Sequence, residues 1–261
     1  MFCHFQHAVD TLRESGEWIR RYPQVVYNTD GSPWKHALPW GDVTVKGNKM
    51  FLAVFEWPAS GELYLPGLKT KIKSARLLRD GTSETVEHKQ VNGWTAFSVP
   101  CQAPEKLVSI IEVELDGPPV ADPCHGLDPA IKTEIRTDFA SVTGAKKDTS
   151  KWMEKFGEWK HVERVTAWEA NGAATWEVDV VEPGNYQVGL SYAGEGRLVW
   201  QVAVEGGESI KNHQNSSHNY QEFPIGWIEF PAPGRYKVSA SCVEGEMESA
   251  SLKSISFVRV P

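Results

Sequence analysis

The polar stretch of residues 206–224, GGESIKNHQNSSHNYQEFP, carries the side chains best suited to hold a ligand in this sequence of 261 residues. Its amide, hydroxyl and imidazole groups, among them those of Asn215 and His218, can exchange hydrogen bonds with sugar hydroxyls. Tyr220 adds an aromatic ring on which the apolar face of a sugar can stack. The stretch is predicted to be a long loop between strands, and long ordered loops are often functional.

Two tryptophans, Trp152 and Trp159, lie in the segment that leads into the first strands of the same region. They would supply an opposing aromatic face if this segment and the polar loop meet at one end of a sandwich. The alternative interpretation is that these aromatic residues close the ends of the sandwich and that the loop is simply mobile.

Motifs for catalysis are missing from the sequence. It contains no G-x-S-x-G elbow, no P-loop and no H-E-x-x-H motif. No pocket signature singles out a pair among its 34 Asp and Glu residues, so these carboxylates are expected on solvated strand faces. The four cysteines lack zinc-ligand spacing, and His213 and His218 lie five residues apart in the predicted loop. We therefore expect no catalytic residue, no metal and no cofactor.

Composition and charge exclude two other classes of partner. The formal net charge is -7 and the basic residues are scattered, whereas a nucleic-acid partner needs a concentrated basic face. No run of about 18 apolar residues is present, so no membrane-spanning helix is expected. The N-terminal MFCHFQ lacks the basic start and apolar core of a signal peptide, which predicts a cytoplasmic location for the chain as written.

The pattern of strands and turns predicts an all-β fold of two β-sandwich domains with one N-terminal helix. Apolar residues at helical spacing predict the helix from about residue 6 to residue 21, ended by Pro23 and followed by the extended segment QVVYNT. Turn dipeptides such as Asn92-Gly93, between alternating segments, predict the first sandwich. Two alternating segments built around Pro-Gly turns predict hairpins of a second, jelly-roll-like sandwich.

The proline-rich segment DGPPVADPCHGLDPAIKT separates the two sandwiches and is typical of a linker. The expected domains are therefore residues 1–29 for the helix and its lead-in, 30–116 for the first sandwich, 117–133 for the linker and 134–261 for the second sandwich.

Three runs in the first half carry a recognisable pattern: LRESGEWIRRYPQVVYNTDGSPW, WGDVTVKGNKMFLAVFEWPASGELYLPGL and KIKSARLLRDG. They resemble the C-terminal region of family 29 α-L-fucosidases, and the resemblance covers residues 9 to about 115. In that family the last helix of the catalytic barrel carries G-x-W-[LI], which stands here at residues 16–19. A β-sandwich then opens with W-G-x-x-T-x-K-G-N and V-F-x-W-P, matched here by residues 40–48 and 54–58. Tyr27-Asn28-Thr29 stands where the family usually has Tyr-Gly-Thr.

The resemblance implies a glycoside hydrolase in which an Asp nucleophile and a Glu acid/base lie on the barrel. No position in this sequence matches the motifs around either residue, so no catalytic residue is carried over. The chain is therefore expected to be a non-catalytic, carbohydrate-binding or accessory region. The alternatives are a piece of a genuine α-L-fucosidase whose barrel lies outside this chain, and a structural β-sandwich protein that binds a partner. Proteins of the resembled family are often secreted or periplasmic.

The second sandwich contains ATWEVDVVEPGNYQVGLSY and the closing run LKSISFVRV, which are similar to the galactose-binding-like sandwiches of carbohydrate-binding modules. That resemblance implies a glycan or fucosylated oligosaccharide as ligand, bound by loop aromatic residues and Asn or acidic side chains at one end of the sandwich. It also adds Tyr192 to the candidates. The complete candidate set is Trp152, Trp159, Tyr192, Asn215, His218 and Tyr220.

The N-terminal helix offers a second contact surface. Its apolar positions Val9, Leu12 and Ile19 form a stripe that covers only one side of a partner, and Trp18 lies off that stripe. Soluble proteins rarely leave a large apolar patch exposed. We therefore expect residues 1–22 to fold back on the first sandwich, to self-associate or to contact a catalytic barrel domain.

Overall fold

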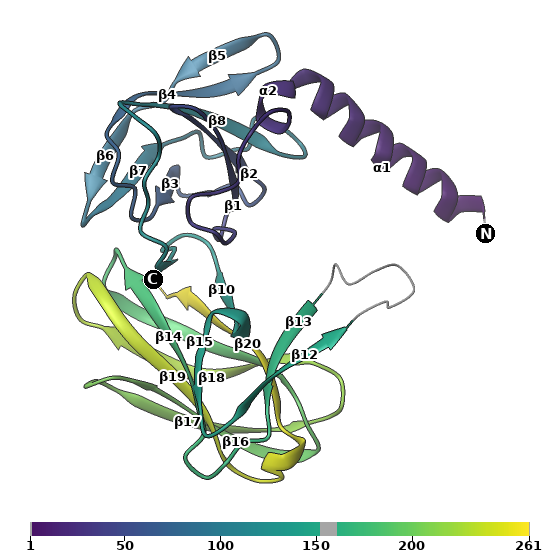
Figure 1. Ribbon diagram of the computed structural model, residues 1–261, viewed down its shortest axis with the longest axis vertical. Helices are drawn as coiled ribbons and strands as arrows, with labels where there is room; N and C mark the ends of the chain where they lie inside the picture. The colour runs from purple at the N-terminus through teal and green to yellow at the C-terminus, as the bar shows by residue number, and fades with distance from the viewer. Residues whose placement is uncertain (1, 152–160, 261) are drawn as a thin grey trace. The chain divides into compact units, whose positions relative to one another are not determined.

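The structure is a computed structural model that describes residues 2–151 and 161–260. By its internal contacts the chain divides into two units, the first made of residues 1–90 and 95–123 and the second of residues 91–94 and 124–261. Both units consist mainly of β-strands, with one long helix at the N-terminus (Figure 1). The prediction of an all-β fold with two sandwiches and one N-terminal helix is therefore confirmed. In the described part of the chain, no helix has the length and apolar character needed to cross a bilayer.

The first unit begins with helices α1 (Phe2–Arg21) and α2 (Pro23–Val26) and continues with two sheets. One sheet has the strand order β1-β2-β8-β4-β5, and the other has the order β3-β7-β6. The strands are β1 (Gly41–Lys46), β2 (Lys49–Val54), β3 (Glu62–Leu65), β4 (Ile72–Arg79), β5 (Thr82–Thr85), β6 (His88–Val91), β7 (Trp94–Ser98) and β8 (Ser109–Leu115).

The tight turns of this unit lie where the sequence predicts them. Asn92 and Gly93 join β6 to β7 with φ angles of 48° and 85°, the left-handed pair that a two-residue hairpin requires. Gly47, with a φ angle of 60°, begins the turn between β1 and β2. Glycine and asparagine tolerate this conformation far better than other residues, so they fix the register of each hairpin.

The segment after Pro23 differs from the prediction of an extended segment. Residues Pro23–Val26 form the short helix α2, with the proline in its first turn. Proline ends α1 because it lacks an amide hydrogen, but its fixed φ angle suits the first position of a new helix. The same residue therefore stops one helix and starts the next.

Helix α1 packs against the first unit through its last turns, without Leu12 of the predicted stripe. The Trp18 indole donates a hydrogen bond to the Val108 carbonyl over 2.9 Å, and Tyr22 enters a small core with Val25, Phe51, Ala53 and Ile110. On the stripe, Leu12 is 73% exposed. The C-terminal part of the helix is thus held to its own unit by the face that carries Trp18, because that face leads directly to the buried Tyr22.

The second unit is a sandwich of two sheets. One has the order β12-β13-β20-β15-β18, with β10 paired to β20, and the other has the order β11-β14-β19-β16-β17, with β9 paired to β14. The strands are β9 (His125–Leu127), β10 (Thr133–Arg136), β11 (Ser141–Thr143), β12 (Lys146–Lys151), β13 (His161–Thr166), β14 (Ala173–Val180), β15 (Gly184–Ala193), β16 (Gly196–Val204), β17 (Ser209–Ser216), β18 (Gln221–Phe230), β19 (Gly234–Glu244) and β20 (Ser251–Arg259).

Alternation along the strands builds the core of the second unit. On β15, Tyr186, Val188, Leu190 and Tyr192 all have 0% exposure, and they belong to one apolar cluster with residues of the opposite sheet such as Trp176. Residues between them on the strand point to the other face of the sheet. Each sheet therefore has one inner, apolar face and one outer face that is free for other roles.

The prediction of a long loop over residues 206–224 is wrong. Most of this stretch forms strand β17, the first part of β18 and a short connection between them. β17 is an edge strand paired to β16, and alternate residues along it are exposed. An edge strand needs few large apolar side chains, so the polar composition of β17 did not indicate a strand.

Candidate functional site

The structure removes one predicted residue from the candidate set and leaves two undescribed. Tyr192 is fully buried in strand β15, and its ring packs against Trp200 and Phe223 at centroid distances of 5.1 and 4.5 Å. A buried ring offers no face to a sugar, so Tyr192 belongs to the core. Trp152 and Trp159 lie outside the described residues.

The remaining three candidates lie at or after the end of β17, but their contacts diverge. Asn215 is exposed on β17, and His218 lies 3.0 Å from the Glu195 carboxylate. The hydroxyl of Tyr220 lies 2.6 Å from that of Ser251 at the start of β20, and 38% of Tyr220 is exposed. Neither contact brings the side chains of Asn215, His218 and Tyr220 together at one site.

A groove of about 250 Å³ lies on the sheet that contains β20, β15 and β18. We call it the outer-face groove, because its strand side chains, apart from that of the buried Val188, alternate with the buried ones described above. It is lined by Lys132, Gln187, Val188, Gly189, Glu222, Pro224, Ser256 and Val258. Apart from Lys132, its residues lie on β15, β18 and β20, and the register of these three strands brings them together.

Gly189 forms the floor of the outer-face groove. It pairs with Ser256 on one side and with Pro224 on the other. A Cβ atom at this position would lie 2.7 Å from the Ser256 hydroxyl oxygen and 2.9 Å from Oε1 of Glu222, which is closer than real Cβ contacts come. The absence of a side chain therefore lets the Glu222 carboxylate lie across the floor.

The Glu222 carboxylate is the main charged group in the groove. Ser256 donates a hydrogen bond to it over 2.5 Å, and Lys132 forms an ion pair with it. Burial raises the pKa of Glu222, but the hydrogen bonds from Lys132 and Ser256 outweigh this effect, so the pKa is lowered overall. The group is ionised at neutral pH and can accept hydrogen bonds from ligand hydroxyls.

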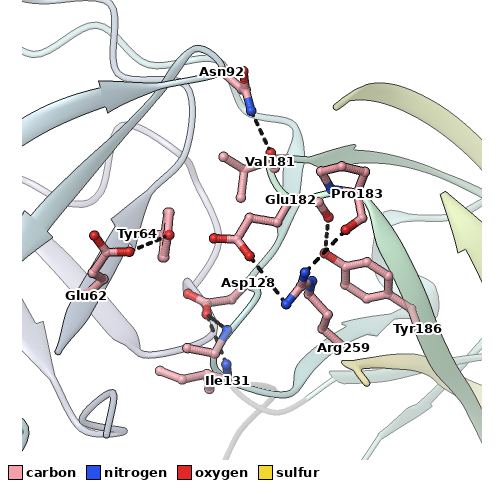
Figure 2. A network of polar contacts seen from close by, with 11 residues as sticks. Glu62, Tyr64, Asn92, Asp128, Ile131, Val181, Glu182, Pro183, Tyr186 and Arg259 are labelled. Carbon is pink, nitrogen blue, oxygen red and sulfur yellow. Dashed lines mark hydrogen bonds and ion pairs between the residues drawn. The ribbon is translucent and has the colours of Figure 1, made fainter. Parts of the chain in front are cut away.

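A buried aspartate shapes the turn that carries Lys132. Oδ1 of Asp128 accepts hydrogen bonds from the amides of Ala130 and Ile131 at 2.8 and 3.0 Å, which closes a tight turn (Figure 2). Its own amide donates to the Thr133 hydroxyl over 2.9 Å. Asp128 is 3% exposed, and this burial raises its pKa to about 6 against the opposing effect of the two amides. The turn therefore holds Lys132 in place beside the groove.

An exposed tryptophan stands next to the groove. Gln187 pairs with Trp227 on β18 and with Val258 on β20, so the three form one row across the outer face. Trp227 is 60% exposed and Val258 is 38% exposed, whereas Ile228, the next residue on β18, is fully buried. A flat aromatic surface thus adjoins a carboxylate, a primary amide and a hydroxyl.

Sequence reasoning missed the outer-face groove and Trp227, although one signal was present. In the run WIEF, Trp227 alternates in phase with Glu229, while Ile228 and Phe230 occupy the other phase. Glu229 is exposed and Phe230 is buried, so the phase of the acidic residue identifies the solvent face. A tryptophan in that phase should have been a candidate.

Comparison with known proteins finds likeness in structure alone, because no family model and no curated protein sequence matches the chain. An α-L-fucosidase from Vibrio sp. strain EJY3 matches 97% of this chain and 45% of its own, with a TM-score of 0.63 and 20% identity. A family 29 α-L-fucosidase from Bacteroides thetaiotaomicron matches 39% of this chain and 23% of its own, with a TM-score of 0.34 and 25% identity. A family 35 carbohydrate-binding module from Clostridium thermocellum matches 50% of this chain and all of its own, with a TM-score of 0.40 and 14% identity.

The chain spans somewhat less than half the length of the Vibrio protein. At 20% identity that likeness concerns the fold, and it extends over nearly every residue of this chain. The chain has the fold of the matching part of an α-L-fucosidase, which confirms the resemblance predicted from the sequence.

Proposed function

We propose that the second unit binds carbohydrate in the outer-face groove, and that the chain is a non-catalytic accessory region of a glycoside hydrolase related to α-L-fucosidases. The observation that carries the proposal is the position of Trp227 beside the groove, 60% exposed and in one row with Gln187. An exposed indole provides a stacking surface for the apolar face of a sugar ring.

The polar groups of the groove complement that stacking surface. Glu222 is an ionised acceptor, and hydrogen bonds to charged groups are stronger than those between neutral groups. Gln187 offers both a donor and an acceptor. Stacking with a few partly exposed hydrogen bonds, set against the cost of association, suggests a free energy of binding of roughly 4 to 7 kcal/mol, or millimolar to tens-of-micromolar affinity.

Neither of the two carboxylates described above, Glu222 and Asp128, fits the role of a glycosidase general acid. A glycosidase general acid needs a raised pKa so that it is protonated when it meets the substrate. Glu222 has a lowered pKa, because Lys132 and Ser256 stabilise its charged form against the effect of burial. Asp128 has a raised pKa but is 3% exposed, so substrate does not reach it.

The test is a titration of the full chain with a panel of glycans, followed by tryptophan fluorescence and calorimetry. We expect a response from the wild type, and a loss of at least about tenfold in affinity in the Trp227→Ala variant. Phe55→Ala is the matched control, because Phe55 is equally exposed, at 60%, but belongs to the first unit. No response to the panel up to about 10 mM, corresponding to less than about 3 kcal/mol of binding, would contradict the proposal.

We also propose that the exposed side of helix α1 contacts a catalytic barrel domain, with self-association as the alternative. The likeness to a longer α-L-fucosidase supports the first option. Leu12 is the residue to substitute in a test, since it is 73% exposed and its substitution should not disturb the first unit. Sedimentation of the wild type and of Leu12→Glu separates the two: self-association predicts a dimer that the variant loses, and contact with a barrel predicts a monomer in both.

A further inference from the structure

A second exposed aromatic residue, Tyr220, lies toward the opposite end of the face that carries Trp227. Tyr220 is held there by the side chains that it contacts. Its hydroxyl lies 2.6 Å from that of Ser251, and Nζ of Lys253 lies 5.9 Å from the centre of its ring. Arg164 on β13 also interacts with Tyr220, since Asp148 and Tyr220 together raise the pKa of the Arg164 guanidinium.

These contacts place Tyr220 on the outer face of the sheet. Ser251 and Lys253 flank Leu252, which is fully buried in the core. Arg164 precedes Val165, which is also fully buried and pairs with Leu252. Because neighbouring residues on a strand point to opposite faces, Ser251 and Arg164 point outward, as Gln187 and Trp227 do. Lys253 is the unpaired residue where the register of β20 shifts, and its ammonium group reaches the Tyr220 ring.

The two aromatic residues are separated by most of the length of β18. Trp227 lies opposite Gln187 on β15, and Gln221, which follows Tyr220, lies opposite Tyr192. Five residue steps along β15, with one more to reach Tyr220, correspond to about 20 Å at about 3.3 Å per residue. A single sugar ring cannot contact both aromatic side chains over that distance.

Polar side chains occupy the face between the two rings. Ser191 pairs with Glu222 on one side and with Ser254 on the other, one row beyond Gly189. Ser254 donates a hydrogen bond to Glu134 over 2.6 Å. The outer face therefore presents an aromatic surface, a polar floor and a second aromatic surface along the strand direction.

From this arrangement we infer that the ligand is a linear oligosaccharide of several units, which lies along the outer face and stacks on Trp227 at one end and on Tyr220 at the other. This inference rests on the proposed carbohydrate-binding function and specifies its ligand class. An isolated terminal sugar such as fucose would use one aromatic residue only, whereas a chain reaches both and gains from each contact without a second loss of translational freedom.

Chain length is the variable that tests the inference. The full chain is titrated with L-fucose and with β-1,4-linked gluco-, xylo- and manno-oligosaccharides, from the monosaccharide to the hexasaccharide. For at least one series we expect affinity to rise with length by about tenfold or more and then to level off once the chain spans the face. Tyr220→Ala should weaken binding of the long members by about tenfold and leave the disaccharide unchanged, whereas Trp227→Ala should weaken both.

Two further variants separate stacking from structural effects. Tyr220→Phe keeps the ring and loses the contact with Ser251, so it should retain binding of the long members. Phe55→Ala alters an exposed aromatic side chain of the first unit, and it should bind like the wild type. Equal affinity for short and long members, with Tyr220→Ala without effect, would overturn the inference and leave the proposed function intact. Absence of binding to every member, together with no response to the wider glycan panel, would overturn both.

Discussion

Replacing Tyr22 with alanine should detach helix α1 from the first unit and destabilise that unit. Tyr22 is 2% exposed and packs in one cluster with Val25, Phe51, Ala53 and Ile110. Truncation of a buried aromatic side chain typically costs about 3–5 kcal/mol, through lost burial and the cavity left behind. A loss of that size is comparable to much of the stability of a small domain.

The conservative variant Tyr22→Phe separates packing from hydrogen bonding. The Tyr22 hydroxyl donates to Oε1 of Glu105 over 2.8 Å, and Arg21 forms an ion pair with the same carboxylate at 3.0 Å. Because Arg21 remains as a partner, Glu105 is not left unpaired. We therefore expect Tyr22→Phe to cost about 1.5 kcal/mol, the low end for a hydrogen bond to a charged group.

The assay is urea unfolding of the full chain followed by tryptophan fluorescence, in which the two units can unfold in separate transitions. The transition of the second unit should stay unchanged and so serves as an internal reference. Leu12→Ala is the control within the helix, since Leu12 is 73% exposed, and it should shift the first transition by less than about 0.5 kcal/mol. A Tyr22→Ala variant with an unchanged first transition, or a Leu12→Ala variant as destabilised as Tyr22→Ala, would refute the reasoning.

Three other outcomes are expected. Gly189→Ala should weaken glycan binding by about tenfold, because the added Cβ would lie 2.7 Å from the Ser256 hydroxyl and 2.9 Å from Glu222. Calorimetry should show little change in the unfolding of this variant, since the Glu222 side chain is flexible. Burial raises the pKa of Asp128 from 3.8 to about 6, so its contribution to stability is fully present below pH 3.8 and is lost as the pH rises through 6. Asp128→Asn retains an acceptor for the amides of Ala130 and Ile131. In urea titrations the free energy of unfolding of this variant, relative to that of the wild type, should therefore increase by up to about 3 kcal/mol from pH 4 to pH 7. A difference between the two proteins that stays constant with pH would contradict this. The chain alone should not hydrolyse aryl α-L-fucosides, and turnover above a no-protein control that persists through repurification would argue against the non-catalytic role.

Much of the fold could be predicted because its signals are local. The Asn92-Gly93 turn adopts the two left-handed conformations that its residue types favour. Alternation along the segment around Tyr186 to Tyr192 identifies an inner face, and the structure buries those residues completely. Each such signal depends on a few neighbouring residues, so a single sequence is sufficient to read it.

The outer-face groove could not be predicted in the same way, since it depends on register between distant strands. Gly189, Glu222 and Ser256 become neighbours only because β15 pairs with both β18 and β20. Both pairings shift register along β15, one between Val188 and Gly189 and the other between Ser191 and Tyr192. A shift of one residue exchanges the two faces of a strand, so alternation alone cannot say which polar residues share a surface.

The division of the strands into two faces also explains where function can lie in this unit. Inner positions such as Leu190 and Ile255 are fully buried, and changes there act on stability first. The outer positions of the same strands contribute little to the core, so they are free to carry the exposed Trp227 and the charged Glu222. Tyr192 fails as a binding residue for the same reason that Trp227 qualifies, because the phase of each on its strand decides whether its ring meets the core or the solvent. Substitutions in the outer phase should therefore change glycan binding with little change in unfolding free energy, and those in the inner phase should do the reverse.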